Sequence, residues 1–91
     1  MTKNELVDQI AERAGLSKSQ AGEALTATLT AIEEGLARGE EISISGFGKF
    51  TVAHRDARQG VNPATGEPMQ IAASRSPRFS AGAKLKQAVK T

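Results

Sequence analysis

Apolar residues recur at helical spacing over the first fifteen positions. Thr2 and Glu5 match a capping box, in which two side chains satisfy free backbone N–H groups at the start of a helix. Gly15 tolerates the left-handed conformation that commonly ends helices. The pattern therefore predicts a first helix between them, with one apolar face: Leu6, Val7, Ile10, Ala11 and Ala14.

A second helical pattern follows almost at once. Ser17 and Gln20 form another capping box, and the spacing behind it predicts a helix of about twenty residues that ends near Gly39. Because the link is short, the two helices should form a helical hairpin. The stripe along the second helix favours close packing against a partner helix, although an intrachain core would produce the same pattern: Ala21, Leu25, Thr28, Leu29, Ile32 and Leu36.

The hydrophobic period then changes from helical to two residues. Ile42 and Ile44 alternate with serines, and Phe50 and Val52 continue the alternation beyond a glycine-rich turn at residues 46–48. This pattern predicts two half-buried strands joined by a tight turn. The backbone N–H groups of such a turn suit a phosphate, but a structural hairpin explains the same residues without a ligand.

The pattern of residues 54–74, called the arm below, predicts a long β-hairpin that projects from the domain. Asn62 and Pro63 open a turn, and Gly66 supplies the positive φ that returns the chain, so Pro63 is the outermost residue. Two strands of about ten residues would extend ~30 Å, and an isolated ribbon is marginally stable in water. We therefore expect the arm to be mobile when free and ordered when bound.

The chain after the arm predicts a third strand and a short last helix. Residues 75–79 form the strand, and Pro77 places it at an edge because proline lacks a ladder donor. Ser80 is positioned to cap the helix, with three apolar residues on its inner face: Leu85, Ala88 and Val89.

Composition makes a single copy of this chain a poor globular domain. The 91 residues include three aromatic side chains and no cysteine, and with the arm outside the core little bulk remains to be buried, so a second copy is expected to complete the core. No apolar run approaches the ~20 residues of a membrane span, and the N-terminus lacks a signal-peptide pattern, which predicts a cytoplasmic protein without a membrane partner.

Charge is distributed unevenly along the chain. Residues 1–41 carry four basic and eight acidic side chains, whereas residues 42–91 carry eight basic and two acidic ones. An anionic partner, nucleic acid first among candidates, should therefore lie against the second half, although a solvated basic face is the commoner meaning of such a surplus.

The chain lacks the residues that an enzyme would need. It has one histidine and no cysteine, and His54 with Asp56 lies at the root of a solvated arm, where simple pairing is the more ordinary role. The turn at residues 46–48 lacks the helix and lysine of a nucleotide-binding loop. We therefore expect no enzymatic activity, no metal site and no cofactor.

The order of these segments resembles the bacterial HU/IHF family of DNA-bending proteins, and HU most of all. The resemblance spans essentially all 91 residues, and its motifs have the family's order and separation: Ser45-Gly46-Phe47-Gly48-Lys49-Phe50, Arg55 to Arg58, Asn62-Pro63-Ala64-Thr65-Gly66, Ile71, Ala73, Pro77, Phe79 and Gly82-Ala83-Lys84-Leu85-Lys86.

The resemblance implies an α+β fold: an N-terminal helical hairpin, a three-stranded antiparallel sheet with a protruding β-ribbon arm, and a short C-terminal helix. It implies one DNA-binding domain over residues 1–91, with a helical dimerisation part at 1–39 and the sheet, arm and last helix at 40–91. Two such chains would intertwine as a homodimer, or as a heterodimer with a paralogue, and embrace double-stranded DNA with both arms.

The resemblance also assigns roles to individual residues. Pro63 would wedge between base pairs and kink the duplex from the minor groove. The implied DNA-binding residues are Lys3, Ser45, Gly46, Lys49, Arg55, Arg58, Asn62, Pro63, Met69, Ile71, Ala73, Arg75 and Lys84. The implied dimer core comprises Leu25, Leu29, Ile32, Leu36, Phe47, Phe50 and Phe79.

This chain departs from the family pattern at three arm positions. Val61, Glu67 and Gln70 stand where basic residues are common in the family, so fewer phosphate contacts and a shallower salt dependence should follow.

The implied function is non-sequence-specific binding and bending of DNA, with a role in compacting the nucleoid. One alternative is an IHF-like protein that selects particular DNA sites by indirect readout. A second alternative is a dimeric scaffold that binds another protein, and not DNA, through its arms.

Overall fold

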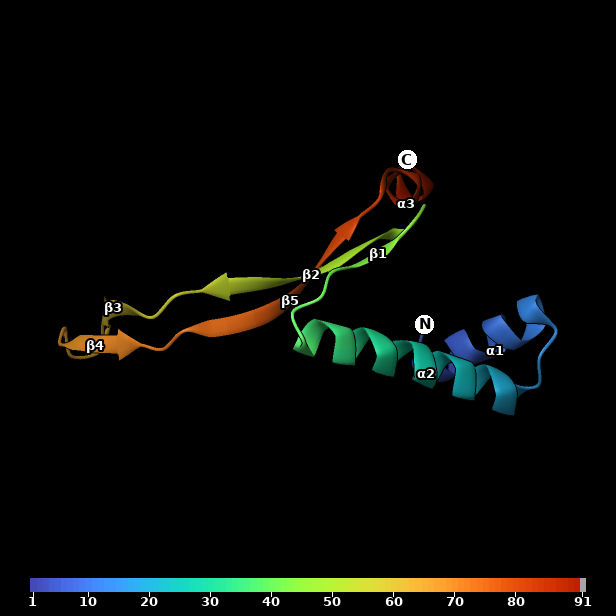
Figure 1. Cartoon of the computed structure of the whole chain (residues 1–91), viewed down its shortest axis with the longest axis horizontal. Helices are drawn as coiled ribbons and strands as arrows, with labels where there is room; N and C mark the ends of the chain where they lie inside the picture. Colours follow the sequence, from blue (N-terminus) through green and yellow to red (C-terminus); the bar gives the residue numbers. More distant parts are fainter. Residues whose placement is uncertain (91) are drawn as a thin grey trace. The chain divides into compact units, whose positions relative to one another are not determined.

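The computed structural model describes residues 1–90 and has the predicted α+β fold. Its elements (Figure 1) are α1 (Lys3–Ala14), α2 (Lys18–Ala37), β1 (Ile42–Ile44), β2 (Gly48–Arg55), β3 (Arg58–Val61), β4 (Pro68–Ile71), β5 (Ser74–Ala81) and α3 (Ala83–Val89). The chain divides into two compact units, a helical unit of Met1–Gly35 and a sheet unit that begins at Leu36. The boundary thus falls inside α2, a few residues before the division at residue 39 that the sequence predicts.

Both capping motifs start helices as predicted, although only the second forms both hydrogen bonds of the box. The Thr2 hydroxyl accepts the backbone N–H of Glu5 at 3.3 Å, and the same hydroxyl donates to the Glu5 carboxylate at 3.4 Å. Ser17 and Gln20 cap each other reciprocally, with distances of 3.0 and 3.1 Å. Gly15 ends α1 with φ of 68°. Local capping, by side chains at two ends and by the glycine backbone at the third, therefore fixes three of the four helix ends in this hairpin.

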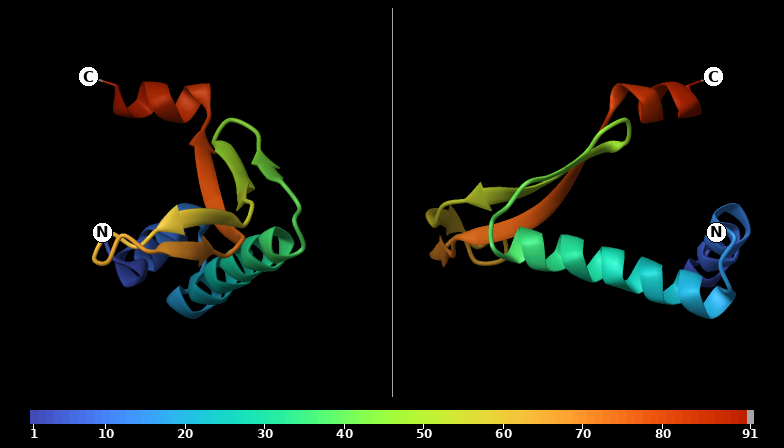
Figure 2. Two further views of the ribbon diagram at one scale, coloured as in Figure 1. Left: turned by 90° about the vertical axis from the view of Figure 1, so that its left-hand side faces the viewer. Right: turned by 45° about the vertical axis from the view of Figure 1, so that its right-hand side comes forward.

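The helical unit buries very little. Within residues 1–90, the buried apolar side chains are Ala11 and Ala21. Helices α1 and α2 lie side by side (Figure 2), and a Cβ added to Gly22 would be 3.9 Å from a methyl group of Val7. The helices approach closely because small residues line the contact, but their larger apolar side chains are left half-buried or exposed.

The sheet unit contains a three-stranded antiparallel sheet with the order β1-β2-β5. Ile42 lies opposite Phe50 in the first pair, and Phe50 lies opposite Phe79 in the second. Pro77 lies on β5, an edge strand, and pairs with Val52 of β2. The edge position predicted from the missing N–H of proline is confirmed.

A tight turn at residues 45–47 joins β1 to β2 and packs against β5. Gly46 has φ of 80°, and the carbonyl of Phe47 accepts the backbone N–H of Gly82 at 2.8 Å. A Cβ added to Gly48 would lie 2.5 Å from the ring of Phe79 and 2.7 Å from the carbonyl oxygen of Ser80. The absence of a side chain at Gly48 is therefore what lets Phe79 lie over the start of β2.

The arm is a hairpin, but its ladder is interrupted. Strands β2 and β5 stay paired as far as Arg55 and Ser74, and pairing resumes between β3 and β4 from Arg58 and Ile71 outwards. Residues 56–57 and 72–73 separate the two ladders. The expectation of two continuous strands of about ten residues is wrong, because these four positions hold one aspartate and three alanines, types that are depleted in strands.

The start of the last helix also differs from the prediction. Ser80 belongs to β5, where it pairs with Lys49, and the N-cap of α3 is Gly82 without a side-chain hydrogen bond. The strand runs on because its ladder with β2 continues to Ala81. Val89, expected on the inner face of α3, is 74% exposed, whereas Leu85 is half-buried.

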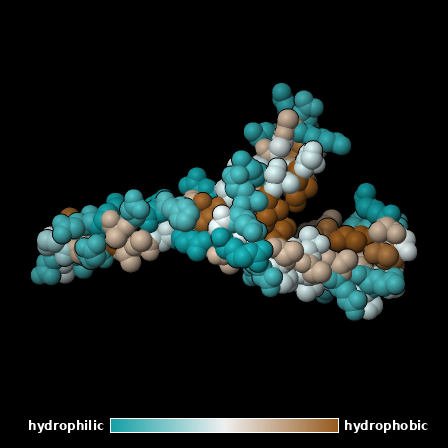
Figure 3. Space-filling model, in the orientation of Figure 1, coloured by the Kyte–Doolittle hydropathy of each residue, from teal (hydrophilic) through white to brown (hydrophobic). Residues whose placement is uncertain are grey.

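Large apolar side chains remain accessible in both units. Leu29 is 47% exposed, and in the sheet unit Phe47 and Phe79 are 45% and 44% exposed. Figure 3 shows apolar atoms at the surface of the helices and of the sheet body, whereas the arm is mostly hydrophilic. A single chain thus leaves uncovered the surface that normally forms a core.

Within the described residues, no helix has both the length and the apolar character needed to cross a membrane.

Replacing Gly48 with alanine should destabilise the protein. The new Cβ would overlap the Phe79 ring and the Ser80 carbonyl, and such overpacking costs about 1–3 kcal/mol. The thermal unfolding midpoint, followed by circular dichroism, should fall by several degrees. Ser43→Ala on exposed β1 is the matched control and should change the midpoint little. A Gly48→Ala protein as stable as the wild type would contradict the packing at this turn.

Candidate nucleic-acid interface

The alternation of side chains along β2 and β5 gives the sheet two chemically different faces. Successive residues of a strand point to opposite faces, so the register puts Phe50, Val52, Pro77 and Phe79 on one face. We call the other the polar face, and its members are Ser43, Lys49, Thr51, Ala53, Arg55, Ser74, Ser76, Arg78 and Ser80. This face carries three basic side chains and no acidic one.

Four predicted DNA-binding residues gather around the β1–β2 turn. Ser45, Gly46, Lys49 and Lys84 line one open depression of about 610 Å³. A Cβ added to Gly46 would lie 3.8 Å from Cδ of Lys84, so the stem of this lysine passes over the turn. Lys49 pairs with Glu41 at 3.4 Å, an exposed contact that salt and solvent screen strongly.

A second group of predicted residues lies at the root of the arm. Arg55, Ala73 and Arg75 line a depression of about 360 Å³ together with His54 and Asp56. His54 lies opposite Arg75 in the ladder. Within residues 1–90, no cluster of three or more potential metal-ligating side chains is present.

Arg75 has structural partners in the sheet unit. Its guanidinium donates to the carbonyl oxygens of Leu36 and Ala37, both at 3.3 Å. The last turn of α2 contains no basic residue of its own, so Arg75 supplies the cation that favours a helix C-terminus. The family resemblance implies a DNA contact for Arg75, and in this structure its guanidinium also donates to backbone carbonyls.

The outer ribbon of the arm also has two faces. Arg58 lies opposite Ile71, and Gly60 lies opposite Met69, so these four share one face. A Cβ at Gly60 would lie 2.6 Å from Cδ1 of Ile71, which shows that the isoleucine folds over the glycine. The predicted arm residues Arg58, Met69 and Ile71 are therefore brought together, with a cation beside an apolar surface.

The turn at the tip is held by hydrogen bonds that one residue, Asn62, accepts. The backbone carbonyl of Asn62 accepts the N–H groups of Thr65 at 3.3 Å and Gly66 at 2.7 Å, and its side-chain Oδ1 accepts that of Ala64 at 2.9 Å. Gly66 has φ of 73°, as the turn requires. Pro63 lies exposed between these bonds, and the predicted turn is confirmed.

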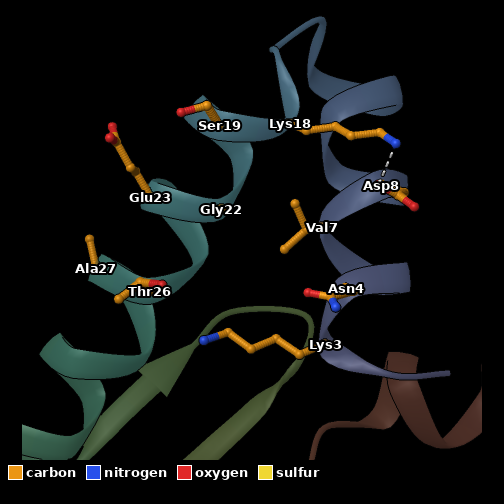
Figure 4. A pocket seen from close by; sticks show the side chains of 10 residues that line it. All are labelled: Lys3, Asn4, Val7, Asp8, Lys18, Ser19, Gly22, Glu23, Thr26 and Ala27. Atoms are coloured by element: carbon orange, nitrogen blue, oxygen red, sulfur yellow. Dashed lines mark ion pairs between the residues drawn. The ribbon is translucent and has the colours of Figure 1, made fainter.

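Lys3 lies in the other unit, in a groove of about 970 Å³ between α1 and α2. Figure 4 shows Lys18 reaching across the groove to Asp8, with Val7 pointing toward α2 beside Gly22. The Lys18–Asp8 distance is 3.4 Å. This groove is mixed in charge and contains one of the predicted DNA-binding residues.

The residues predicted for a dimer core fall into one set in each unit. On α2, Leu25 and Ile32 are half-buried and Leu29 is exposed. In the sheet unit, Leu36 is half-buried, and the ring of Phe79 lies 4.8 Å from that of Phe50 and 5.6 Å from that of Phe47, measured between centroids. The three rings thus form one cluster that one chain leaves partly open.

Arg78 is a candidate that the sequence-based site did not include. It is exposed and lies on the polar face opposite Thr51. The two-residue alternation provides the signal, because a residue beside the inward-facing Phe79 must point outward.

Comparison with known proteins places these features in a family. The family model of bacterial DNA-binding proteins matches residues 1–90. DNA-binding protein HU-alpha of Vibrio proteolyticus is 52% identical over 90 residues, which cover 99% of this chain and all of that protein. DNA-binding protein HU-1 of Halalkalibacterium halodurans is 49% identical with the same coverage.

Solved structures agree with the sequence comparison. An Anabaena HU–DNA cocrystal structure matches with a TM-score of 0.86 and 46% identity, covering 98% of this chain and 97% of that chain. HU from Thermotoga maritima matches with a TM-score of 0.69 and 32% identity, covering 99% of this chain and all of that one. The match over nearly the whole length, in sequence as in fold, confirms the predicted relationship: this chain belongs to the HU/IHF family of bacterial DNA-binding proteins and is most similar to HU.

Proposed function

We propose that this protein binds double-stranded DNA without reading its sequence and bends it, as a homodimer that uses the polar face and two arms. The observation that carries the proposal is the polar face, whose strand residues combine three basic side chains with hydroxyl groups. The carboxylate of Glu41, which precedes β1, contacts this face through an exposed pair with Lys49. Phosphate contacts of this kind supply affinity and orientation but no base specificity. The chain is an architectural DNA-binding protein and not an enzyme.

The proposed contacts form three groups. Lys49 and Lys84 with Ser45 and Gly46 would hold phosphates at the turn, and Arg55 would do so at the root of the arm, beside Ala73. Lys3 would add a phosphate contact from α1. Arg75 would add a phosphate contact at the root of the arm through the guanidinium donors that its bonds to Leu36 and Ala37 do not use.

The arm would enter the minor groove. Arg58 would approach phosphates while Met69 and Ile71 line the groove with apolar surface, and Asn62 would hold the tip in place. Minor-groove architectural proteins, HU and IHF among them, insert apolar wedges between base steps and kink the duplex. Pro63 suits this role because it is exposed at the outermost turn and has neither a flexible side chain nor an N–H to desolvate.

The exposed apolar surfaces support a homodimer. Leu29 and the rings of Phe47 and Phe79 remain accessible in one chain, and burial of such surface contributes about 25 cal/mol per Å². A second copy would bury these side chains in the dimer core. The half-buried residues of the same proposed core would be buried with them: Leu25, Ile32, Leu36 and Phe50. Pairing with a paralogue stays a prediction of the same kind, as does association with the nucleoid in the cytoplasm.

The HU-like mode is preferred over site selection because the relatives identified above are HU proteins. Competition binding against random duplex measures the difference, since a site-selective protein shows a large specificity ratio.

Placing a charge at Leu29 should prevent dimerisation. Leu29→Glu would bury an unpaired carboxylate in the proposed interface, which costs several kcal/mol. Size-exclusion chromatography with light scattering should show loss of the dimer, with loss of helical circular dichroism at micromolar concentration.

Ala31→Glu is the matched control for Leu29→Glu. Ala31 is exposed on the same helix, away from the stripe, so the same new charge should leave the dimer intact. A Leu29→Glu protein that stays dimeric and folded would show that this stripe does not form the interface.

Replacing Pro63 with alanine should reduce DNA bending more than DNA affinity. The variant keeps every basic side chain, so charge-driven binding persists, but it loses the rigid wedge. The bend angle is measured by energy transfer between the ends of a short duplex, and the affinity by fluorescence anisotropy on the same duplex.

Pro68→Ala controls for the loss of a proline in the arm, because Pro68 lies in β4 opposite Val61 and not at the tip. It should bend DNA as the wild type does. Unchanged bending by Pro63→Ala would remove the proline from the mechanism, and absence of DNA binding by the wild type at low salt would refute the proposed function itself.

A further inference from the structure

We infer that Arg78 is a phosphate-binding residue of this protein, and that with Lys49 and Arg55 it makes the polar face a continuous cationic strip. The inference rests on the proposed function and adds a contact that neither the sequence motifs nor the arm supplies. Three observations carry it: the position of Arg78 in the ladder, the absence of a partner for its charge, and the chemistry of its neighbours.

The ladder places Arg78 between the two other basic residues of the polar face. Arg78 lies opposite Thr51, which is two residues from Lys49 and four from Arg55 on β2. At about 3.3 Å per residue, the three cations therefore follow the strand at levels about 7 and 13 Å apart. A row of positive charges at this spacing suits a polyanion that runs along the strand, because no single small anion could contact all three.

The charge of Arg78 is free to meet such a ligand. Among residues 1–90, the ion pairs are Lys18–Asp8, Arg38–Glu40 and Lys49–Glu41, and Arg78 takes part in none of them. Its side chain belongs to an exposed residue. A guanidinium presents several donors in a planar fork that matches a phosphate, so an unpaired one on an open face is well suited to this ligand.

The neighbours of Arg78 on this face are small and carry hydroxyl groups. Ser76 and Ser80 flank it on β5, and Thr51 faces it from β2. Serine and threonine hydroxyls are common donors to DNA phosphates, and their short side chains let a backbone approach the sheet closely. An acidic protein partner would also meet the three cations, but the small hydroxyl side chains around them offer little apolar surface for the buried centre of a protein interface.

The position of an arginine along β5 decides which face of the sheet its side chain lies on, as Arg75 shows. It lies three residues before Arg78, so its side chain points to the opposite face, where it donates to Leu36 and Ala37. The two arginines of β5 thus lie on different faces of the sheet and have different neighbours. The cationic strip also supplies charge at the base of an arm whose outer part carries Val61, Glu67 and Gln70.

The test compares Arg78→Gln with the wild type on short duplexes of three unrelated sequences, over 50–200 mM salt. Each neutralised phosphate contributes about −0.9 to the slope of log K against log salt, and the proposed homodimer carries two copies of Arg78, so the slope of Arg78→Gln should be shallower by about two. Over this range, the wild type should lose about tenfold more affinity than the variant. Arg78→Lys keeps the charge and should retain most of the wild-type slope.

Arg13→Gln is the control for a change of net charge, because Arg13 lies in the last turn of α1 and outside the proposed contacts; its slope should stay at the wild-type value. Thermal unfolding of each variant checks that the fold is kept. An unchanged slope for Arg78→Gln, or a loss of affinity confined to one duplex, would overturn the inference while DNA binding by the wild type still stood. A wild type that binds none of the duplexes would instead overturn the proposed function.

Discussion

Burial of apolar surface is the constraint on which the rest of this molecule depends. Over residues 1–90, one chain buries two alanines as its apolar core and leaves leucine and phenylalanine side chains accessible. The capping boxes and the glycine turns satisfy local backbone hydrogen bonds and so define the helices and strands. They do not enclose an apolar core. Since the stability of a fold is a small difference between burial and conformational entropy, the exposed stripe of α2 and the open phenylalanine cluster make association the natural way to finish the fold.

The strands whose apolar face would be covered by a second chain also carry the proposed DNA-binding surface. Phe50 and Phe79 point to one face of the β2–β5 ladder, while Lys49 and Arg78 next to them point to the other. The two-residue alternation thus separates the apolar side from the cationic side without a dedicated element for either. Covering the apolar face by a second chain would leave the cationic strips of both chains accessible, so assembly and recognition do not compete for the same side chains.

Much of this architecture follows from local sequence, and the exceptions have physical reasons. Thr2, Ser17 and Gly15 act through neighbours within four residues, so the helix ends were predictable, and the alternation of Ile42 to Val52 was enough for the sheet. The role of Arg75 was not, because its carbonyl partners lie 38 and 39 residues away. Ser80 resembles a cap, but the ladder with β2 outweighs that local preference. The outward direction of Arg78 follows from the two-residue alternation, because its neighbour Phe79 points to the apolar face.

The interrupted ladder gives the arm a joint at its base. Residues 56–57 and 72–73 lack the cross-strand pairing found on both sides of them, so the chain can bend there without breaking hydrogen bonds within the ribbon. The tip beyond is fixed by the bonds that Asn62 accepts and donates. On DNA binding, the arm would therefore lose conformational entropy mainly at these four unpaired residues. The hydrogen bonds of the tip already form in the free protein. A joint of this kind would let the arm follow duplexes of different curvature while the hydrogen-bonded tip kept its contacts.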